Sequence, residues 1–153
     1  MSVVDEAVEV ALPNDLTAER EIIGGLLLSG GKSLQAVVEA GLSGSDFYAW
    51  QHEMIWDVVA ALLDESAPVS TIAVRDRLRR SGDLIRVGGP VFLNDLEAGV
   101  LSWSNAGYYA RIVAGHAAKR RAIAAGQKII QAAYAQDTTG ADVEAVALAA
   151  VET

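Results

Sequence analysis

Apolar residues recur along most of this chain at steps of three and four, the spacing that places them on one side of an α-helix. The longest such run extends from Ser102 to Gln136, and no proline interrupts it. Its predicted stripe consists of Tyr109, Ile112, Val113, His116, Ile123, Gln127, Ile130 and Tyr134. A helix of about thirty residues is roughly 45 Å long, longer than a domain of this size is wide. We therefore expect its second half to extend beyond the core and to need a partner.

Shorter helices are predicted on both sides of this run from caps, breakers and spacing. They cover residues 16–28, 33–40, a segment that leads through Phe47 and Trp50, 71–80, 90–97 and 141–153. Asp15, Asp46 and Ser70 are expected to cap three of these helices, because short polar side chains accept hydrogen bonds from free amides. The helix around Trp50 is expected to bury one face, made of Trp50, Met54, Ile55, Val58, Val59, Leu62 and Leu63.

One glycine and one proline mark helix boundaries in the middle of the chain. Gly82 is a natural stop for the helix at 71–80, and Pro90 suits the first position of the next one. The segment 83–89 is predicted to be a tight connection. The last segment, 141–153, is alanine-rich and short, so we expect it to fold back on the long helix or to pair with another chain.

Composition supports an all-α fold in one domain-sized unit. The chain has 153 residues, of which 52% are apolar and only 6% aromatic, and this weighs against a β-sandwich or barrel. The predicted architecture is a compact helical bundle head followed by a long helix and a helical hairpin. Its expected boundaries are a flexible tail at 1–12, the head at 13–113 and a hairpin with a short second arm at 114–153.

Charge argues against a general nucleic-acid binder. The net charge is −8, whereas affinity for nucleic acid depends on neutralised phosphates. Two basic runs remain, Arg75–Arg80 and Lys119–Arg121, and they are interpreted as solvated or partner-docking surfaces before phosphate-tracking sites. A signal peptide and a transmembrane-length apolar run are both lacking, which predicts a cytoplasmic protein with no membrane contact.

The motifs in the sequence do not indicate a catalytic site. Gly30–Ser33 ends like a P-loop, but Leu26 stands where that motif requires glycine. His52 and His116 belong to no cluster with ligand spacing, so structural roles are expected for both. Cysteine is absent, which excludes disulfides and thiolate sites, and no Gly-x-Ser-x-Gly motif occurs. The sequence predicts no catalytic, cofactor-binding or metal-ligating residue and no enzyme activity of its own.

Four stretches in order resemble the N-terminal domain of the DnaB-type replicative DNA helicases, over about residues 13 to 150. The first is Pro13 to Glu19 with Ile22 to Gly25, and the second is Phe47-Tyr48 with His52 and Ile55-Trp56. The third joins Ser81 to Leu84, Val87 to Gly89 and Phe92-Leu93, and the fourth joins Asn105, Tyr108 to Val113 and Arg120. Departures from the family pattern include Thr17 in place of glutamate, Ser70 in place of aspartate, and Trp103 near its usual proline.

The resemblance implies a collar domain, in which helical hairpins pair between copies and the assembly receives primase or a helicase loader. ATP hydrolysis in the family belongs to a separate C-terminal domain. The candidate interface residues are Ile123, Gln127, Ile130, Tyr134, Val143 and Val146, and Gly115 is a candidate hinge, because glycine weakens a helix interior. Two other hypotheses stay open, a stand-alone modulator that binds a helicase or primase through the same fold, and a direct DNA binder.

Overall fold

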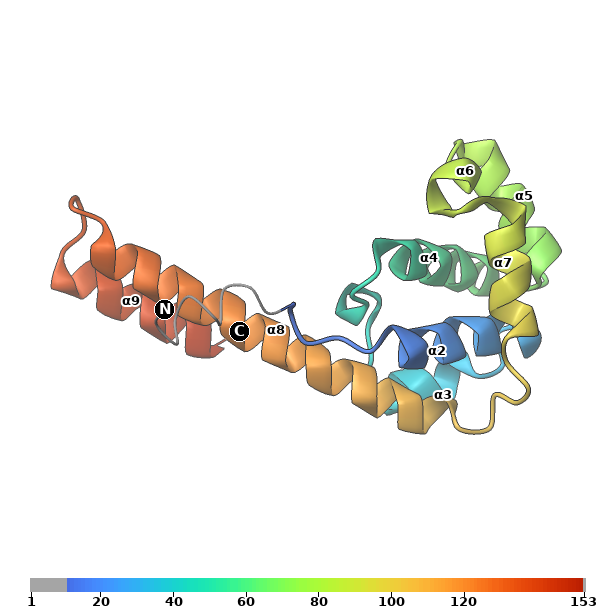
Figure 1. The fold of residues 1–153 in the computed structure, drawn as a ribbon, viewed down its shortest axis with the longest axis horizontal. Helices are drawn as coiled ribbons and strands as arrows, with labels where there is room; N and C mark the ends of the chain where they lie inside the picture. Colours follow the sequence, from blue (N-terminus) through green and yellow to red (C-terminus); the bar gives the residue numbers. More distant parts are fainter. Residues whose placement is uncertain (1–10, 153) are drawn as a thin grey trace. The chain divides into compact units, whose positions relative to one another are not determined.

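The computed structural model describes residues 11–152, and over this range it contains helices and no strand (Figure 1). The all-α fold class is therefore confirmed for the described residues. Residues 1–10 and 153 lie outside them, as does nearly all of the predicted tail. The helices are α2 (Leu16–Leu28), α3 (Leu34–Glu39), the 3₁₀ helix η1 (Gly44–Asp46), α4 (Trp50–Asp64), α5 (Thr71–Ser81), α6 (Leu84–Val87), α7 (Gly89–Ala98), α8 (Ala106–Tyr134) and α9 (Gly140–Glu152).

The chain divides into two compact units, which we call the head unit and the hairpin unit. The head unit comprises residues 14–117, and the hairpin unit comprises 118–153 together with 1–13. Helix α8 contributes its first turns to the head unit and the remainder to the hairpin unit. The boundaries expected from the sequence, at residues 12 and 113, stay predictions.

Local capping explains why several helices begin and end where the sequence indicates. The Asp15 side chain accepts a hydrogen bond from the amide of Ala18 at 3.0 Å, and Ser70 accepts one from Ala73 at 3.1 Å. Gly82 ends α5 with φ +80°, a left-handed conformation that favours glycine. Pro90 lies in the first turn of α7, where its missing N–H costs no helical hydrogen bond.

Three local expectations are wrong. The segment 83–89 was expected to be a tight connection, but it contains the one-turn helix α6 (Leu84–Val87). Asp46 does not cap α4; its carboxylate accepts the amide of Ser43 at 2.9 Å within a capping box around η1. Trp50 was expected on the buried face of α4 but is 47% exposed, whereas His52 and Trp56 are buried. These positions depend on residues far away in the chain, which spacing alone does not reveal.

The core of the head unit surrounds α2, which packs against α4 and α7 (Figure 1). Its most deeply buried large side chains include Ile22, Ile23, Leu26, Val37, Ile55, Val59, Val74, Leu78, Val87 and Leu93. At the α2–α7 crossing, a Cβ added to Gly24 would overlap the carbonyl oxygen of Leu96 and lie 2.5 Å from a Val100 methyl. Glycine is therefore required at position 24, because the two helix backbones approach closely there.

The first turns of α8 meet the head core mainly through small side chains. Ala106, Ala110, Val113 and Ala117 are buried, whereas Tyr109 and Ile112 of the predicted stripe are only half-buried. Alanine favours helix and lets neighbouring backbones come close. The predicted stripe was chosen from the large residues, and it therefore places the contact face of α8 about one residue away from the buried face.

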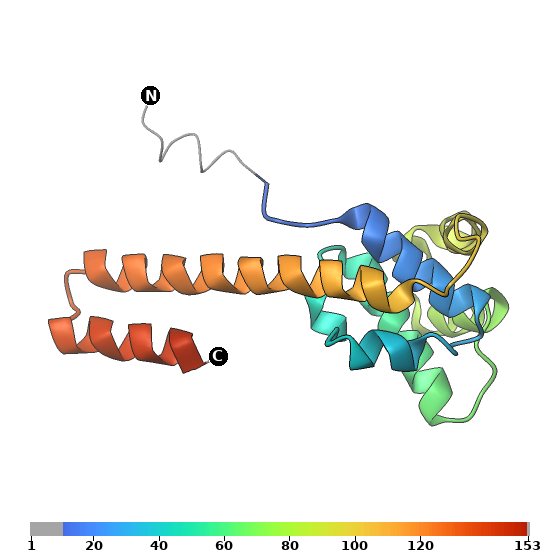
Figure 2. The same cartoon turned by 90° about the horizontal axis from the view of Figure 1, so that it is seen from below.

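In the hairpin unit α9 lies antiparallel beside the later turns of α8 (Figures 1 and 2). Thr138 closes the end of α8, since its hydroxyl donates to the carbonyl of Ala135 at 2.8 Å and to that of Ala132 at 2.6 Å. A reciprocal capping pair starts α9. Thr139 donates its amide to the Asp142 carboxylate at 2.8 Å, and Asp142 donates its amide to the Thr139 hydroxyl at 3.2 Å.

Candidate interaction surfaces

A buried carboxylate fixes the geometry of the head surface. Glu19 of α2 is 0% exposed and accepts the amides of Tyr48 at 2.8 Å and Ala49 at 3.2 Å. The Nδ1 atom of His52 lies 2.8 Å from the Glu19 carboxylate, and the His52 ring stacks on Phe92 of α7. Glu19 therefore joins α2, the entry to α4 and, through His52, the start of α7. The sequence indicates a structural role for His52 but contains no signal for this long-range partner.

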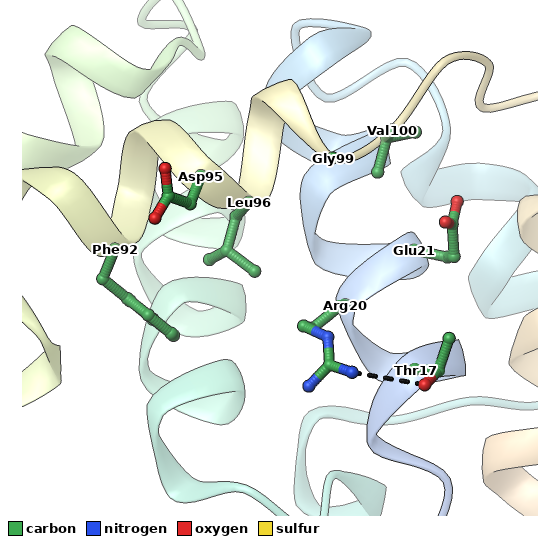
Figure 3. Close-up of a pocket in the computed structure, with 8 residues that line it drawn as sticks. All are labelled: Thr17, Arg20, Glu21, Phe92, Asp95, Leu96, Gly99 and Val100. Atoms are coloured by element: carbon green, nitrogen blue, oxygen red, sulfur yellow. Dashed lines mark hydrogen bonds between the residues drawn. The ribbon is translucent and has the colours of Figure 1, made fainter.

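A groove between α2 and α7 lies beside this network and has a volume of about 370 Å³ (Figure 3). Phe92, Leu96 and Val100 supply its apolar lining. Charges of both signs surround it, from Arg20, Glu21 and Asp95, together with Thr17 and Gly99. The Arg20 guanidinium donates to the Thr17 hydroxyl at 3.2 Å, which holds the cation at one end of the groove (Figure 3). An apolar cleft with a mixed-charge rim is suited to a protein side chain or peptide.

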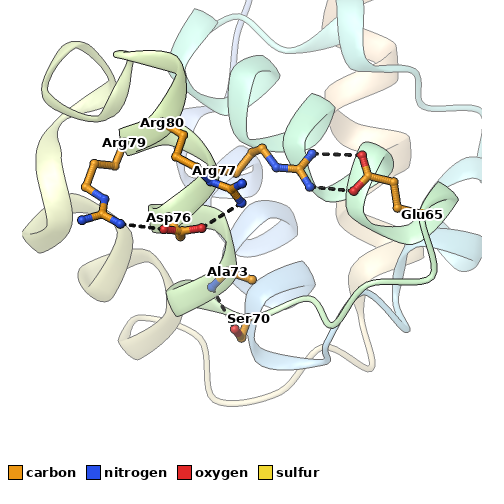
Figure 4. A network of polar contacts seen from close by, with 7 residues as sticks. All are labelled: Glu65, Ser70, Ala73, Asp76, Arg77, Arg79 and Arg80. Carbon is orange, nitrogen blue, oxygen red and sulfur yellow. Dashed lines mark hydrogen bonds and ion pairs between the residues drawn. The ribbon is translucent and has the colours of Figure 1, made fainter.

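The first basic run lies on α5 and is largely paired with carboxylates (Figure 4). Arg77 binds Glu65 through two contacts of 2.6 and 3.2 Å, and Arg79 and Arg80 both contact Asp76 at 2.8 Å. The hydrogen bond from Arg77 lowers the pKa of Glu65, and the one from Arg79 lowers the pKa of Asp76. Exposed pairs of this kind stabilise a fold only slightly, and Arg79 and Arg80 share the single carboxylate of Asp76.

The predicted interface residues of α8 lie at the surface of the hairpin unit. Ile123 is 37% exposed, Ile130 57% and Tyr134 84%, and Gln127 is also exposed. On α9, Val143 and Val146 are half-buried, and Val146 borders a small groove shared with Arg121 and Lys128 of α8. The assignment of all six residues to an interface stays a prediction.

Two exposed residues of α9 are missing from the predicted interface. Leu148 is 65% exposed and Val151 85%, although both are large and apolar. They are three residues apart and therefore share one side of the helix. The sequence signal was available, since Leu148 is the only leucine of α9, but the alanines around it obscure the periodicity.

Gly115 and His116 lie within α8 in its head-unit portion. A methyl group added at Gly115 would meet no atom within 4 Å, so packing within the described chain does not require glycine there. His116 Nδ1 is a buried nitrogen without a hydrogen-bond partner among the described residues. Arg120 of the second basic run donates to the Pro13 carbonyl at 2.7 Å. The hinge at Gly115 stays a prediction.

The Gly30–Ser33 run forms the turn between α2 and α3. Ser33 is buried and hydrogen-bonded to the Ser29 hydroxyl, while Lys32 is exposed. Within residues 11–152, no group of three or more His, Cys, Asp or Glu side chains could hold a metal ion. Over the same residues, every helix is too short or too polar to cross a membrane.

An all-α head followed by a helical hairpin defines the class of fold, and known proteins share it. Residues 11–115 match the family model described as "DnaB-like helicase N terminal domain". The chain therefore belongs to the DnaB-like helicase N-terminal domain family. It is 41% identical over 130 residues to the replicative DNA helicase DnaB of Leifsonia xyli, and 40% identical over 134 residues to that of Mycobacterium leprae.

These alignments cover 85% and 88% of this chain but 28% and 22% of the two helicases. The 153 residues thus correspond to their N-terminal domain and do not include a catalytic domain. The crystal structure of the N-terminal domain of the Mycobacterium tuberculosis DnaB helicase superposes with a TM-score of 0.85 at 36% identity, over 93% of this chain and 99% of that one. A solved DnaB-like replicative helicase, described with its interactions with primase, has the same fold, with a TM-score of 0.71 at 20% identity over 90% of this chain and 30% of that one.

Proposed function

We propose that this domain assembles copies of a replicative helicase through its hairpin unit and docks primase through its head unit. The observation that carries the first part is the exposed apolar stripe of α8. Ile123, Ile130 and Tyr134 are spaced by seven and four residues, so they lie on one side of the helix. Exposed large apolar side chains that gather on one side of a helix favour an interaction site. The site of action would be the bacterial cytoplasm, where the chromosome is replicated.

The stripe is tested by a pair of substitutions that add the same charge to neighbouring positions. Ile130→Asp places a carboxylate on the stripe, and Gln131→Asp places one beside it on an exposed position. Sedimentation at about 100 μM, well above a micromolar dissociation constant, should show a dimer or larger species for the wild type and for Gln131→Asp. Ile130→Asp should be mainly monomeric with a folded head. A monomeric wild type, or equal association of the two variants, would contradict the proposal.

Docking of primase is assigned to the groove between α2 and α7. The groove combines the half-buried Phe92 with opposite charges at Arg20 and Asp95, and this arrangement selects a partner by both shape and charge. The solved helicase described with its interactions with primase has this fold. A helicase loader is the other partner implied by the family resemblance. We assign primase to this groove because of that solved structure.

Adjacent exposed residues of α7 provide a matched test of the groove. Asp95→Lys reverses a charge that lines the groove, and Asn94→Lys adds the same cation to a residue that does not. Calorimetric titration with primase from the same organism should give at least tenfold weaker binding for Asp95→Lys and a change below twofold for Asn94→Lys. Absence of primase binding by the wild type at about 100 μM would refute the assignment, as would equal binding by both variants.

A further inference from the structure

A second groove of the head unit, of about 650 Å³, lies among α5, α6 and α7. It is lined by Ser70, Ile72, Ala73, Arg75, Asp76, Arg79, Leu84 and Pro90. Its apolar part is accessible, since Ile72 is 68% exposed. The groove therefore offers aliphatic surface to a ligand on a different side of α7 from the groove that contains Phe92 and Asp95.

The charge of this groove is opposite to that of the whole chain. Helices α5 and α6 carry five arginines and one aspartate, whereas the chain has a net charge of −8. Asp76 is shared between Arg79 and Arg80, so its single carboxylate does not neutralise both (Figure 4). Arg75 is exposed and makes no ion pair or hydrogen bond with the described residues. The rim of the groove is thus locally cationic.

A cationic rim beside an aliphatic floor selects a peptide with both carboxylates and aliphatic side chains. Nucleic acid suits it less well, because Ile72, Leu84 and Pro90 offer nothing to phosphates. The chain itself contains a segment with the required chemistry. Residues 2–10, Ser-Val-Val-Asp-Glu-Ala-Val-Glu-Val, contain four valines and three carboxylates, and no lysine or arginine precedes Arg20.

We propose that the groove among α5, α6 and α7 binds residues 2–10, here called the acidic arm, of a second copy of this chain. Nine extended residues span about 30 Å, enough to pass from the arginine rim across the aliphatic floor. Binding of the arm of a second copy rests on the proposed self-association, because association would raise the effective concentration of the acidic arm at the groove. The affinity of the groove for the arm does not depend on that association.

The groove is tested by titrating a fluorescein-labelled peptide of residues 1–12 with the full chain and following its anisotropy. Arg75→Glu should weaken binding at least tenfold without breaking an existing ion pair. Arg111→Glu, which reverses an exposed arginine of α8 outside the groove, is the matched control and should change the affinity less than twofold. A peptide in which Asp5, Glu6 and Glu9 are replaced by lysine should regain affinity for the Arg75→Glu chain.

Absence of peptide binding at about 1 mM, or equal binding by wild type and Arg75→Glu, would overturn the proposal. It would also be overturned if the groove bound a single-stranded DNA oligonucleotide in an Arg75-dependent manner and ignored the peptide. The source of the arm is tested by disulfide trapping, because the chain has no cysteine. A chain with Val4→Cys and a differently tagged chain with Ile72→Cys should form a mixed disulfide. If this mixed disulfide does not form, and a chain that carries both cysteines forms only an intramolecular disulfide, the arm in the groove does not come from a second copy.

Ile130→Asp separates failure of this proposal from failure of the proposed function. A chain with this change should still bind the labelled peptide with unchanged affinity, even if it no longer self-associates. Loss of peptide binding by Ile130→Asp, with a folded head, would place the peptide on the hairpin stripe and overturn the groove assignment.

Discussion

The head unit and the hairpin unit bury their side chains in opposite ways. In the head unit, Ile22, Ile23 and Leu26 are completely inaccessible to solvent, and even the carboxylate of Glu19 is enclosed and hydrogen-bonded. In the hairpin unit no residue from 118 to 152 is buried, although Ile130, Leu148 and Val151 are large and apolar. Burial of apolar surface is the main source of folding stability. The head therefore obtains its stability from its own core, whereas the hairpin buries little apolar surface within the described chain, and a second copy that covers it is our proposal.

Glu19→Ala is expected to have the largest effect on the stability of the head. If the head were unaffected, the contrast between the two units would not hold. The change leaves the amides of Tyr48 and Ala49 and the Nδ1 of His52 without their buried acceptor. We expect a loss of about 3–5 kcal/mol in the free energy of unfolding of the head. Urea unfolding followed by tryptophan fluorescence measures it, since Trp56 is buried in the head. Glu21→Ala on the same helix should change stability by only about 0.5 kcal/mol. A loss below about 1 kcal/mol for Glu19→Ala would disprove the role assigned to the carboxylate.

The next comparison places the same glycine-to-alanine change in each unit. Gly24→Ala forces α2 away from the Leu96 carbonyl and should cost about 1–3 kcal/mol. Gly126→Ala in the hairpin unit meets open space and should stabilise its helix by about 0.5–1 kcal/mol. Thermal unfolding by circular dichroism at several concentrations tests both. Equal effects of the two changes would mean that the close α2–α7 approach does not hold in solution.

Gly115→Ala tests the hinge and should have a small positive effect. Because an added methyl group would meet no neighbour, the change should stabilise α8 by about 0.5–1 kcal/mol. In the wild type, backbone amides at 114–118 should exchange with solvent faster than those at 109–112 and 123–130, and the substitution should reduce this difference. If exchange is uniform across the three segments, α8 has no hinge at this position.

The smallest expected effect is an acid dependence of the hairpin. The backbone hydrogen bond from Thr139 lowers the pKa of Asp142, and so does the Thr139 side chain. A carboxyl whose pKa is lower in the folded state stabilises that state above its unfolded pKa of about 4 and loses this contribution as the pH falls through the lowered value. The amide shift of Thr139 should report a titration midpoint below about pH 4. Asp142→Asn should abolish that titration, and a wild-type midpoint at or above pH 4 would contradict the capping role.

Local chemistry explains what the sequence predicted well. Asp15, Ser70 and Gly82 act on residues within three or four positions, so the ends of α2 and α5 follow from the sequence alone. The start of α4 does not, because the acceptor for its leading amides is Glu19, about thirty residues earlier. Helix α6 was missed because a single turn between glycine-rich segments has no periodicity to detect. For the surfaces, the sequence indicated Ile130 and Tyr134, but both head grooves require the packing of α7 against α2 and α5 to be known.

The buried Glu19 carboxylate also has a consequence for the order of folding. Helix α4 starts at Trp50 with Ala49 as its cap residue, and no side-chain hydrogen bond from a neighbouring residue completes that cap. The acceptor for the two leading amides arrives only when a loop of about thirty residues has closed, and loop closure costs entropy before its contacts repay it. We therefore expect the first turn of α4 and the docking of α2 to form together. The head is then expected to unfold in a single cooperative transition in which α4 and α2 are lost together.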